Sequence, residues 1–245
     1  MSIQLIQTEP LILTITEDSA NNIDTIDAGA AYTQYLHDQV GDFEQQPLGN
    51  FVEVVSKSIN PRSSKYAREI FEYIDCAEID EIYGYILRFK INSGGEIGST
   101  KNRFQKHDIL FAKVMPTLAN KKIALVTEDV TNAVASTELI VLRKKPEVEI
   151  NLYYLFRALR SDHFTRQAIA NVTGATGLQR INPSRLLELK IIVPPQELQN
   201  QIGDAVEQEF TLRTLAAEQS KKADDLARLV LGSLTLRTDK KRHNK

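Results

Sequence analysis

The sequence predicts an α+β fold in which a β-rich domain precedes one long α-helix. Short apolar runs, rich in β-branched and aromatic residues, follow one another at close spacing from Pro47 onward and are separated by turn-forming residues. This pattern is typical of strands. Beyond Pro194 and Pro195, residues 197–236 contain no proline and are rich in Ala, Leu, Glu, Gln, Lys and Arg. These residues favour helix strongly, so we expect a single long helix there.

Six apolar runs are the expected strands of a largely antiparallel or mixed sheet: residues 51–55, 82–87, 109–112, 123–126, 139–142 and 191–193. The two prolines end the last run, because proline cannot donate a hydrogen bond to a sheet. Residues 153–169 predict a helix that packs on the sheet. Its apolar face is formed by Leu152, Phe156, Leu159 and Phe164, which recur at helical spacing.

Residues 1–45 are predicted to be an acidic leader with a short helix around residues 28–40. Residues 1–50 contain eight acidic residues and no Lys or Arg. A secretory signal needs a basic start and a membrane span needs about 18 consecutive apolar residues, and neither is present. The single cysteine, Cys76, excludes an internal disulfide. We therefore expect a soluble cytoplasmic protein with no membrane partner.

The formal net charge of -2 hides a segregation of charge along the chain. Residues 88–122 contain eight basic and only two acidic residues. Such a stretch is suited to face phosphate, although a solvated surface rich in lysine explains the same composition. The basic residues are Arg88, Lys90, Lys101, Arg103, Lys106, Lys113, Lys121 and Lys122.

Two interleaved seven-residue series run through the long helix. One contains Leu198, Ala205, Leu212, Gln219 and Leu226, and the other contains Ile202, Glu209, Ala216, Ala223 and Val230. An unbroken helix of this length, roughly 58 Å, extends beyond its own domain, so its seam predicts a partner helix. The alternative is a helical hairpin that folds back at residues 211–214. The expected partner contacts are Leu198, Ile202, Ala205, Leu212, Ala216, Ala223, Leu226 and Val230.

The sequence contains no recognisable catalytic constellation. The four histidines lack metal-ligand spacing, and neither glycine cluster, at residues 93–95 and 173–177, continues as a phosphate-binding loop. No cofactor motif of an adenine methyltransferase is present either. We expect a protein that is not an enzyme and that holds no metal and no cofactor.

An ordered set of segments resembles the specificity (S) subunits of type I restriction-modification systems. Residues 174–181, then the strand at 191–193, then Pro194 and Pro195 and the start of the long helix, resemble the end of a target recognition domain in this family. The segments at 47–49, 106–111, 122–126 and 135–139 resemble earlier landmarks in the same order.

The resemblance implies a non-catalytic DNA-reading subunit with one recognition domain and one spacer helix, half of what full-length family members carry. It covers about residues 46–236, as a DNA target recognition domain (46–196) and a dimerisation and spacer helix (197–236). The acidic leader (1–45), which matches no part of the family, and a basic tail (237–245) complete the expected division of the chain. The implied partners are double-stranded DNA, a DNA adenine methyltransferase subunit, a restriction endonuclease subunit and a second copy that pairs in inverted orientation to read a split target.

Two alternatives remain open from the sequence, a dimerising protein-binding adaptor and the recognition module of a fused restriction enzyme. For the DNA-reading function, Gln179 and Arg180 are suited to bidentate base contacts, although Gln179 could equally satisfy backbone groups of a tight turn. The expected DNA-binding residues are Lys101, Arg103, Lys106, Lys113, Lys121, Lys122, Gln179 and Arg180.

Overall fold

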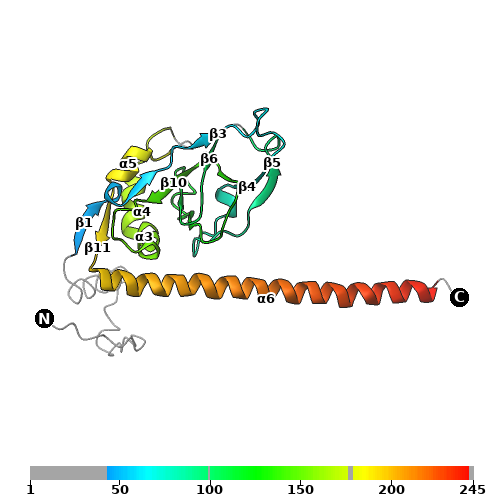
Figure 1. The fold of residues 1–245 in the computed structure, drawn as a ribbon. Coiled ribbons are helices and arrows are strands. Elements are labelled where there is room, and N and C mark those ends of the chain that lie inside the picture. Colours follow the sequence, from blue (N-terminus) through cyan, green and yellow to red (C-terminus); the bar gives the residue numbers. More distant parts are fainter. Residues whose placement is uncertain (1–42, 99, 176–178, 243–245) are drawn as a thin grey trace, which may run out of the picture. The chain divides into compact units, whose positions relative to one another are not determined.

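The computed structural model describes residues 43–98, 100–175 and 179–242. Residues 44–245 belong to one unit, and the fold described below is that of this unit (Figure 1). The predicted acidic leader, apart from its last three residues, and the short helix at residues 28–40 lie outside the described residues.

The β-rich part contains three sheets. The four-stranded sheet is antiparallel, with the order β2 (Val52–Val54), β10 (Leu139–Lys144), β7 (Ile109–Ala112) and β8 (Ile123–Leu125). The five-stranded sheet has the order β3 (Ser58–Ile59), β6 (Lys101–Arg103), β9 (Ala133–Ala135), β4 (Ile70–Ile74) and β5 (Lys90–Ser93). Its β4 and β9 are parallel, so the sheet is mixed. A small sheet pairs β1 (Glu44–Pro47) with β11 (Lys190–Val193).

The side chains of β7 alternate between two cores and hold the layers together. Ile109 and Phe111 face a core shared with the helices, whereas Leu110 and Ala112 face a core shared with Ile74 and its neighbours on the five-stranded sheet. The four-stranded sheet is therefore a middle layer, buried on both faces, and the helices and the five-stranded sheet are the outer layers (Figure 1).

Five of the six predicted strands are confirmed, and the strand at residues 82–87 is wrong. That segment is a turn, with one isolated bridge between Ile79 and Ile86. Gly84 has a φ of 76°, a left-handed conformation that interrupts an extended strand. The end of the last strand at Val193, immediately before the two prolines, is also confirmed.

The helical layer consists of α3 (Leu152–Leu159), α4 (Asp162–Ala170) and α5 (Pro183–Glu188), together with the 3-10 helix η1 (Leu48–Asn50). A second 3-10 helix, η2 (Cys76–Glu78), follows β4, and its Cys76 packs in the core shared with the five-stranded sheet. The single helix predicted at 153–169 is two helices. Ser161 separates them, because its hydroxyl accepts a hydrogen bond from the N–H of Phe164 (3.1 Å) and thereby caps a new helix.

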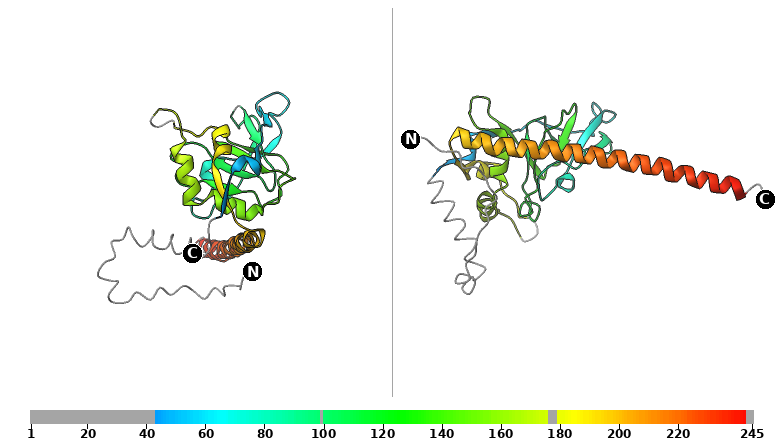
Figure 2. Two further views of the ribbon diagram at one scale, coloured as in Figure 1. Left: turned by 90° about the vertical axis from the view of Figure 1, so that its left-hand side faces the viewer. Right: turned by 90° about the horizontal axis from the view of Figure 1, so that it is seen from below.

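The predicted long helix is confirmed as α6 (Gln196–Arg242), and the fold-back alternative is wrong because α6 is unbroken across residues 211–214. It also includes residues 237–242 of the predicted tail. Its first turns pack on the domain: Gln199 and Val206 are buried, and the Phe210 ring lies 5.6 Å from that of Phe156 on α3. The side chains from 214 to 231 are exposed, and this part extends beyond the domain (Figure 2).

The α+β fold is thus confirmed. Among the described residues, no helix combines the length and hydropathy needed to cross a membrane.

Candidate nucleic-acid interface

One face of the five-stranded sheet carries basic and aromatic side chains. The register places Arg103 opposite Val134, Val134 opposite Tyr73, and Tyr73 opposite Lys90, and residues paired in this way share a face of the sheet. Lys101, two residues before Arg103 on β6, lies on the same face. Adjacent strands thereby bring together cations that are distant in the sequence.

Tyr66 packs against this face. Its ring packs edge-on against that of Phe71, with the centroids 6.4 Å apart. Phe71 belongs to a small apolar cluster with Ile97 and Val134. The Lys65 ammonium lies 4.9 Å and the Arg103 guanidinium 5.8 Å from the Tyr66 centroid. A hydrogen bond with Lys65 lowers the pKa of Tyr66, and the Arg103 charge acts in the same direction.

The cations of this face differ in whether they are paired with carboxylates, buried, or accessible to a ligand. Lys90 pairs with Asp75 and Glu78, at 2.9 Å each. Lys101 is only 9% exposed, and burial, followed by the charge of Arg62, lowers its pKa. The more accessible cations are Arg62, Lys65 and Arg103, which we call, together with Tyr66, the cation–aromatic cluster.

Within the cluster, two side chains are held by polar contacts. The Arg103 Nη1 donates to Asn132 Oδ1 (2.9 Å), and the Arg62 Nε donates to the Ile97 carbonyl (3.1 Å). Each contact fixes one nitrogen of a guanidinium group that has several N–H donors, so both groups can offer further donors to a ligand.

Three of these four residues were missed from the sequence. Arg62, Lys65 and Tyr66 lie in residues 51–87, where acidic residues outnumber basic ones. Counting charge over a shorter segment would have found the two cations, because Arg62, Lys65 and Arg68 occur within seven residues without an acidic residue.

The predicted DNA-binding residues fall into separate groups. Lys101 and Arg103 lie together on β6. Lys113, Gln179 and Arg180 form a second group, in which Gln179 accepts from the Met115 N–H and Lys113 accepts from the Ile181 N–H through their carbonyls, 2.9 Å each. Burial, followed by the charge of Arg180, lowers the pKa of Lys113.

The other predicted cations are engaged with acidic or carbonyl oxygens. Lys106 pairs with Asp129 (2.9 Å) and Lys121 with Asp162 (2.5 Å). The Lys122 ammonium donates to the Ile79 carbonyl (2.6 Å). Their contact with DNA stays a prediction, and we leave them out of the cation–aromatic cluster.

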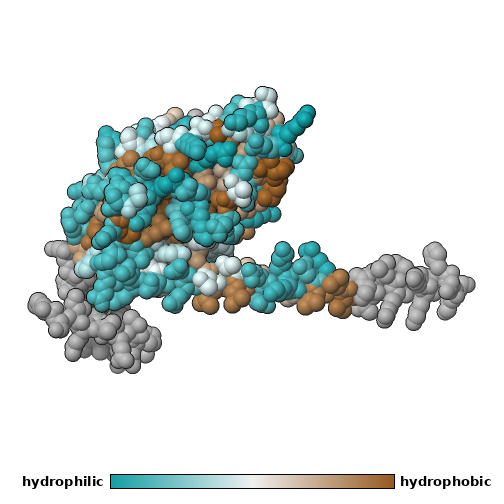
Figure 3. Space-filling view, viewed as in Figure 1, coloured by the Kyte–Doolittle hydropathy of each residue, from teal (hydrophilic) through white to brown (hydrophobic). Residues whose placement is uncertain are grey.

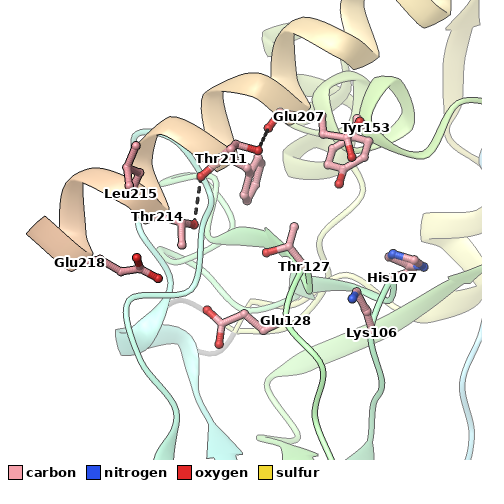
Figure 4. A pocket seen from close by; sticks show the side chains of 11 residues that line it. Lys106, His107, Thr127, Glu128, Tyr153, Glu207, Thr211, Thr214, Leu215 and Glu218 are labelled. Atoms are coloured by element: carbon pink, nitrogen blue, oxygen red, sulfur yellow. Dashed lines mark hydrogen bonds between the residues drawn. The ribbon is translucent and has the colours of Figure 1, made fainter.

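A groove of about 600 Å³ lies between α6 and the loops before β7 and after β8. Figure 4 shows Glu128 and Glu218 at one end, with Lys106 and His107 at the other. Glu207 adds a third carboxylate to the lining. This acidic lining is unfavourable for a phosphate backbone, so the groove and the cation–aromatic cluster are suited to different ligands.

The predicted partner contacts on α6 do not all have the same environment. Ile202 packs against the main core. Glu209, which follows Ile202 in the same seven-residue series, pairs with Arg213 (2.9 Å) and Arg157 (3.6 Å). The side chains of Ile202 and Glu209 therefore face the domain. By contrast, the predicted contacts Ala205, Leu212, Ala216, Ala223, Leu226 and Val230 are exposed, and Leu198 is half-buried.

This architecture, a layered β-rich domain joined through two prolines to a long helix, matches known DNA specificity proteins. The model of the type I restriction modification DNA specificity domain matches residues 41–224, and the chain belongs to this family. The family predicted from the sequence is thus confirmed.

Two curated relatives are specificity subunits of Escherichia coli type I restriction enzymes. The EcoDI subunit is 29% identical over 127 residues and the EcoEI subunit is 30% identical over 115 residues. These alignments cover 52% and 46% of this chain but only 26% and 19% of the two subunits.

Two solved structures share the fold. The HsdS subunit from Thermoanaerobacter tengcongensis superposes with a TM-score of 0.56 at 26% identity, covering 75% of this chain and 47% of that subunit. A second structure, which addresses the complex assembly and conformational transition of the type I R-M system, contains a chain that superposes with a TM-score of 0.55 at 25% identity. The match covers 78% of this chain and 49% of that chain. This chain thus spans about half the length of these solved relatives.

Proposed function

We propose that the chain is a non-catalytic DNA-binding subunit that directs a type I restriction-modification methyltransferase, and an endonuclease subunit, to a DNA target. Family membership supports a role in DNA targeting. In this proposal the chain binds as a homodimer, each copy reads half of a split site, and the adenine methyltransferase subunit supplies both the cofactor and the chemistry.

The cation–aromatic cluster is the observation that carries the proposal. Accessible Lys and Arg side chains neutralise backbone phosphates and fix the register of a protein on the duplex. Arg103 also has a planar fork of donors that can read guanine in the major groove. The acidic groove offers no comparable surface, so DNA is expected at the cation–aromatic cluster.

The exposed part of α6 supports pairing with a second copy. Leu212, Leu226 and Val230 are 66%, 63% and 59% exposed, and Figure 3 shows apolar side chains gathered at two places along this part of the helix. An exposed apolar stripe of this kind favours association. On α6 the stripe is turned away from the side that packs on the domain, so a second helix could cover it without displacing the domain.

The charges of α6 favour an inverted pair. Residues 197–227 contain seven acidic and three basic residues, whereas residues 228–242 contain one acidic and five basic residues. In an antiparallel pair that overlaps over the whole helix, residues 228–242 face residues 197–211, which contain four acidic and no basic residues, while a parallel pair places like charges together. Inverted pairing would place the two recognition domains at opposite ends, as a split target requires.

DNA binding by the cation–aromatic cluster is tested by charge reversal. We expect the double variant Lys65→Glu, Arg103→Glu to bind duplex DNA at least tenfold more weakly, in fluorescence anisotropy at fixed salt. Two lost phosphate contacts should also reduce the slope of log affinity against log salt by roughly 2. The matched control is Lys190→Glu, Arg166→Glu, which reverses two exposed cations on the helical layer and β11.

Equal loss of affinity in both double variants would mean that net charge alone binds DNA, which would overturn the assignment to this face. A wild-type chain that binds no duplex at low salt would reject the DNA-binding proposal and favour the adaptor. A second assay follows methyl transfer: the purified chain should show none, and activity should require an added methyltransferase subunit.

A further inference from the structure

Arg160 is a buried arginine that binds backbone carbonyls instead of an acidic partner. Its Nη1 donates to the carbonyls of Lys121 and Ile123, and its Nη2 donates to those of Glu81 (2.9 Å) and Ile82 (2.8 Å). The side chain is only 5% exposed. It therefore ties the turn at residues 79–87 to the start of β8.

Other contacts fix the same turn. Gly84 crosses directly over the Arg160 guanidinium, where a Cβ atom would collide with that group and with the Ile123 carbonyl. The Tyr83 N–H donates to Asp80 Oδ1 (2.5 Å), and the Lys122 ammonium donates to the Ile79 carbonyl (2.6 Å). The turn thus has a defined conformation that presents Tyr83 at the surface.

Tyr83 contacts the long helix. The Arg213 guanidinium lies 3.2 Å from the centroid of the Tyr83 ring and 5.8 Å from that of Tyr85. The two rings are stacked on each other, 6.4 Å apart at 19°. Stacking of a guanidinium on an aromatic face combines cation–π attraction with planar contact. Glu209 accepts two hydrogen bonds from Arg213, at 3.0 and 2.9 Å, and holds that guanidinium in place.

Arg213 is the last residue of α6 before the exposed stretch at 214–231. The helix is attached to the domain at two places, along α3 through Phe210 and at the turn through Arg213. Attachment along α3 alone would leave the helix free to pivot about that line of contact. The second attachment, on a different element, restricts that pivoting.

We propose that Tyr83, Tyr85 and Arg213 form a clamp that fixes the angle at which α6 leaves the domain, with Arg160 as the positioning residue that holds the clamp in place. The clamp then determines the spacing between the two half-sites that a dimer accepts, a consequence that rests on the proposed function. It makes Tyr83 and Arg213 determinants of spacing specificity without requiring either to touch DNA.

A small change of angle has a large effect at the far end of the helix. The residues from 214 to 242 continue α6 for roughly 44 Å at about 1.5 Å per residue. A tilt of about 10° would move that end by roughly 8 Å. This displacement corresponds to about two base-pair steps of roughly 3.4 Å each, enough to change which spacing a paired molecule fits.

The angle can be measured by pulsed electron spin resonance on the full chain. Spin labels are placed at Thr137→Cys on the domain and Ser220→Cys on the exposed helix. The native Cys76 does not compete, because it is 5% exposed and burial raises its pKa to about 11. Labelled chains are diluted into excess unlabelled protein, so that each dimer carries one labelled copy.

We expect Tyr83→Ala and Arg213→Gln to broaden the distance distribution at least twofold. Two controls should retain the wild-type width: Tyr83→Phe, which keeps the ring, and Arg166→Gln, which removes an arginine outside the clamp. Circular dichroism shows whether each variant is folded. Unchanged widths in folded Tyr83→Ala and Arg213→Gln would overturn the clamp.

The consequence for DNA is tested with a target selected by the wild-type chain from random duplexes, then rebuilt with its two halves moved apart one base pair at a time. We expect the wild type to prefer one spacing by at least tenfold, and Tyr83→Ala to accept neighbouring spacings within threefold while binding a single half-site as before. If Tyr83→Ala retained the sharp preference for one spacing, the role of the clamp in determining half-site spacing would be overturned. Absence of DNA binding by the wild type would instead reject the proposed function, and the distance measurement would still decide the clamp.

Discussion

Asp108 illustrates how a single buried carboxylate organises the turn that leads into the central strand. It is 1% exposed. Its Oδ2 accepts hydrogen bonds from the Gln105 N–H (2.8 Å) and Arg143 Nη2 (2.7 Å), and its Oδ1 accepts from Arg143 Nε (2.7 Å). The two-pronged contact joins the turn before β7 to the end of β10 and raises the pKa of Arg143, chiefly through the hydrogen bonds.

Asp108→Ala should lower the free energy of unfolding by about 2–3 kcal/mol, because the charge-assisted bonds are lost and donors are left without a partner. Urea denaturation measures this change. Asp129→Ala is the control. Asp129 also forms an ion pair, with Lys106, but its side chain is 89% exposed, so we expect a change within about 0.5 kcal/mol. An equal loss of stability in the two variants would show that burial of the Asp108 ion pair does not increase its contribution to stability.

A contrast between a buried and an accessible charge also separates two residues for which the sequence predicted the same role. Arg103 and Lys101 are two residues apart in a basic stretch, yet the first is accessible and the second is 9% exposed. Both lie on one face of β6, so alternation along the strand does not separate them. The Lys101 ammonium lies 5.9 Å from the Tyr73 ring centroid, and the charge of Arg62 contributes to lowering its pKa. The positions of both neighbours depend on contacts that only the fold creates.

At the scale of elements, the first turns of α6 are part of the β-rich domain, because their inner side chains are buried against it. Gly203 faces Asn151, whose side-chain oxygen caps α3 by accepting from the N–H groups of Tyr153 (3.0 Å) and Tyr154 (3.1 Å). A Cβ atom at residue 203 would collide with the Asn151 side chain. A glycine in a helix interior, unfavourable by propensity, is required here by the close approach of two helices.

Gly203→Ala should therefore destabilise the protein by about 1–3 kcal/mol despite the better helix propensity of alanine. Gly232→Ala, in the same helix beyond the packed turns, should stabilise α6 by roughly 0.5–1 kcal/mol. Thermal unfolding followed by circular dichroism at one protein concentration compares the two. A stabilising effect at both positions would show that the α3 contact does not restrict residue 203.

At the scale of the whole molecule, the exposed apolar stripe on α6 predicts which substitutions dissociate the proposed dimer. Placing Asp at both Leu212 and Leu226 should dissociate it, because each buried leucine contributes roughly 1.5–3 kcal/mol and each carboxylate would be buried without a partner. In a two-fold dimer each change occurs twice. Sedimentation velocity at micromolar concentration measures the result, and circular dichroism should show that the domain remains folded.

The control for this prediction is Ala217→Asp with Lys221→Asp, two exposed positions on the opposite side of the helix. This variant should remain dimeric although it changes the charge more. A monomeric wild type, or a dimer that survives the Leu212 and Leu226 changes, would overturn the proposal that this stripe is the dimer seam.

The sequence by itself determined the fold class, the family, five of the six strands expected from apolar runs, and the unbroken long helix. These features follow from local periodicity and composition, which act over a few turns of chain. It missed β5 and β6 as strands because Lys90, Lys101 and Arg103 interrupt their apolar pattern, and it missed β1, β3 and β9 because they are short and weakly apolar. It also missed β4 (Ile70–Ile74), although that segment is rich in apolar and aromatic residues.

Only the tertiary structure decided which residues form the cation–aromatic cluster and the clamp. Arg103 meets Tyr66 through the pairing of distant strands, and Tyr83 meets Arg213 across 130 residues of sequence because Arg160 ties a turn beneath the helix. Local sequence constrains a residue's own conformation, whereas these contacts depend on how separate elements pack. Their geometry is therefore a property of the assembled layers.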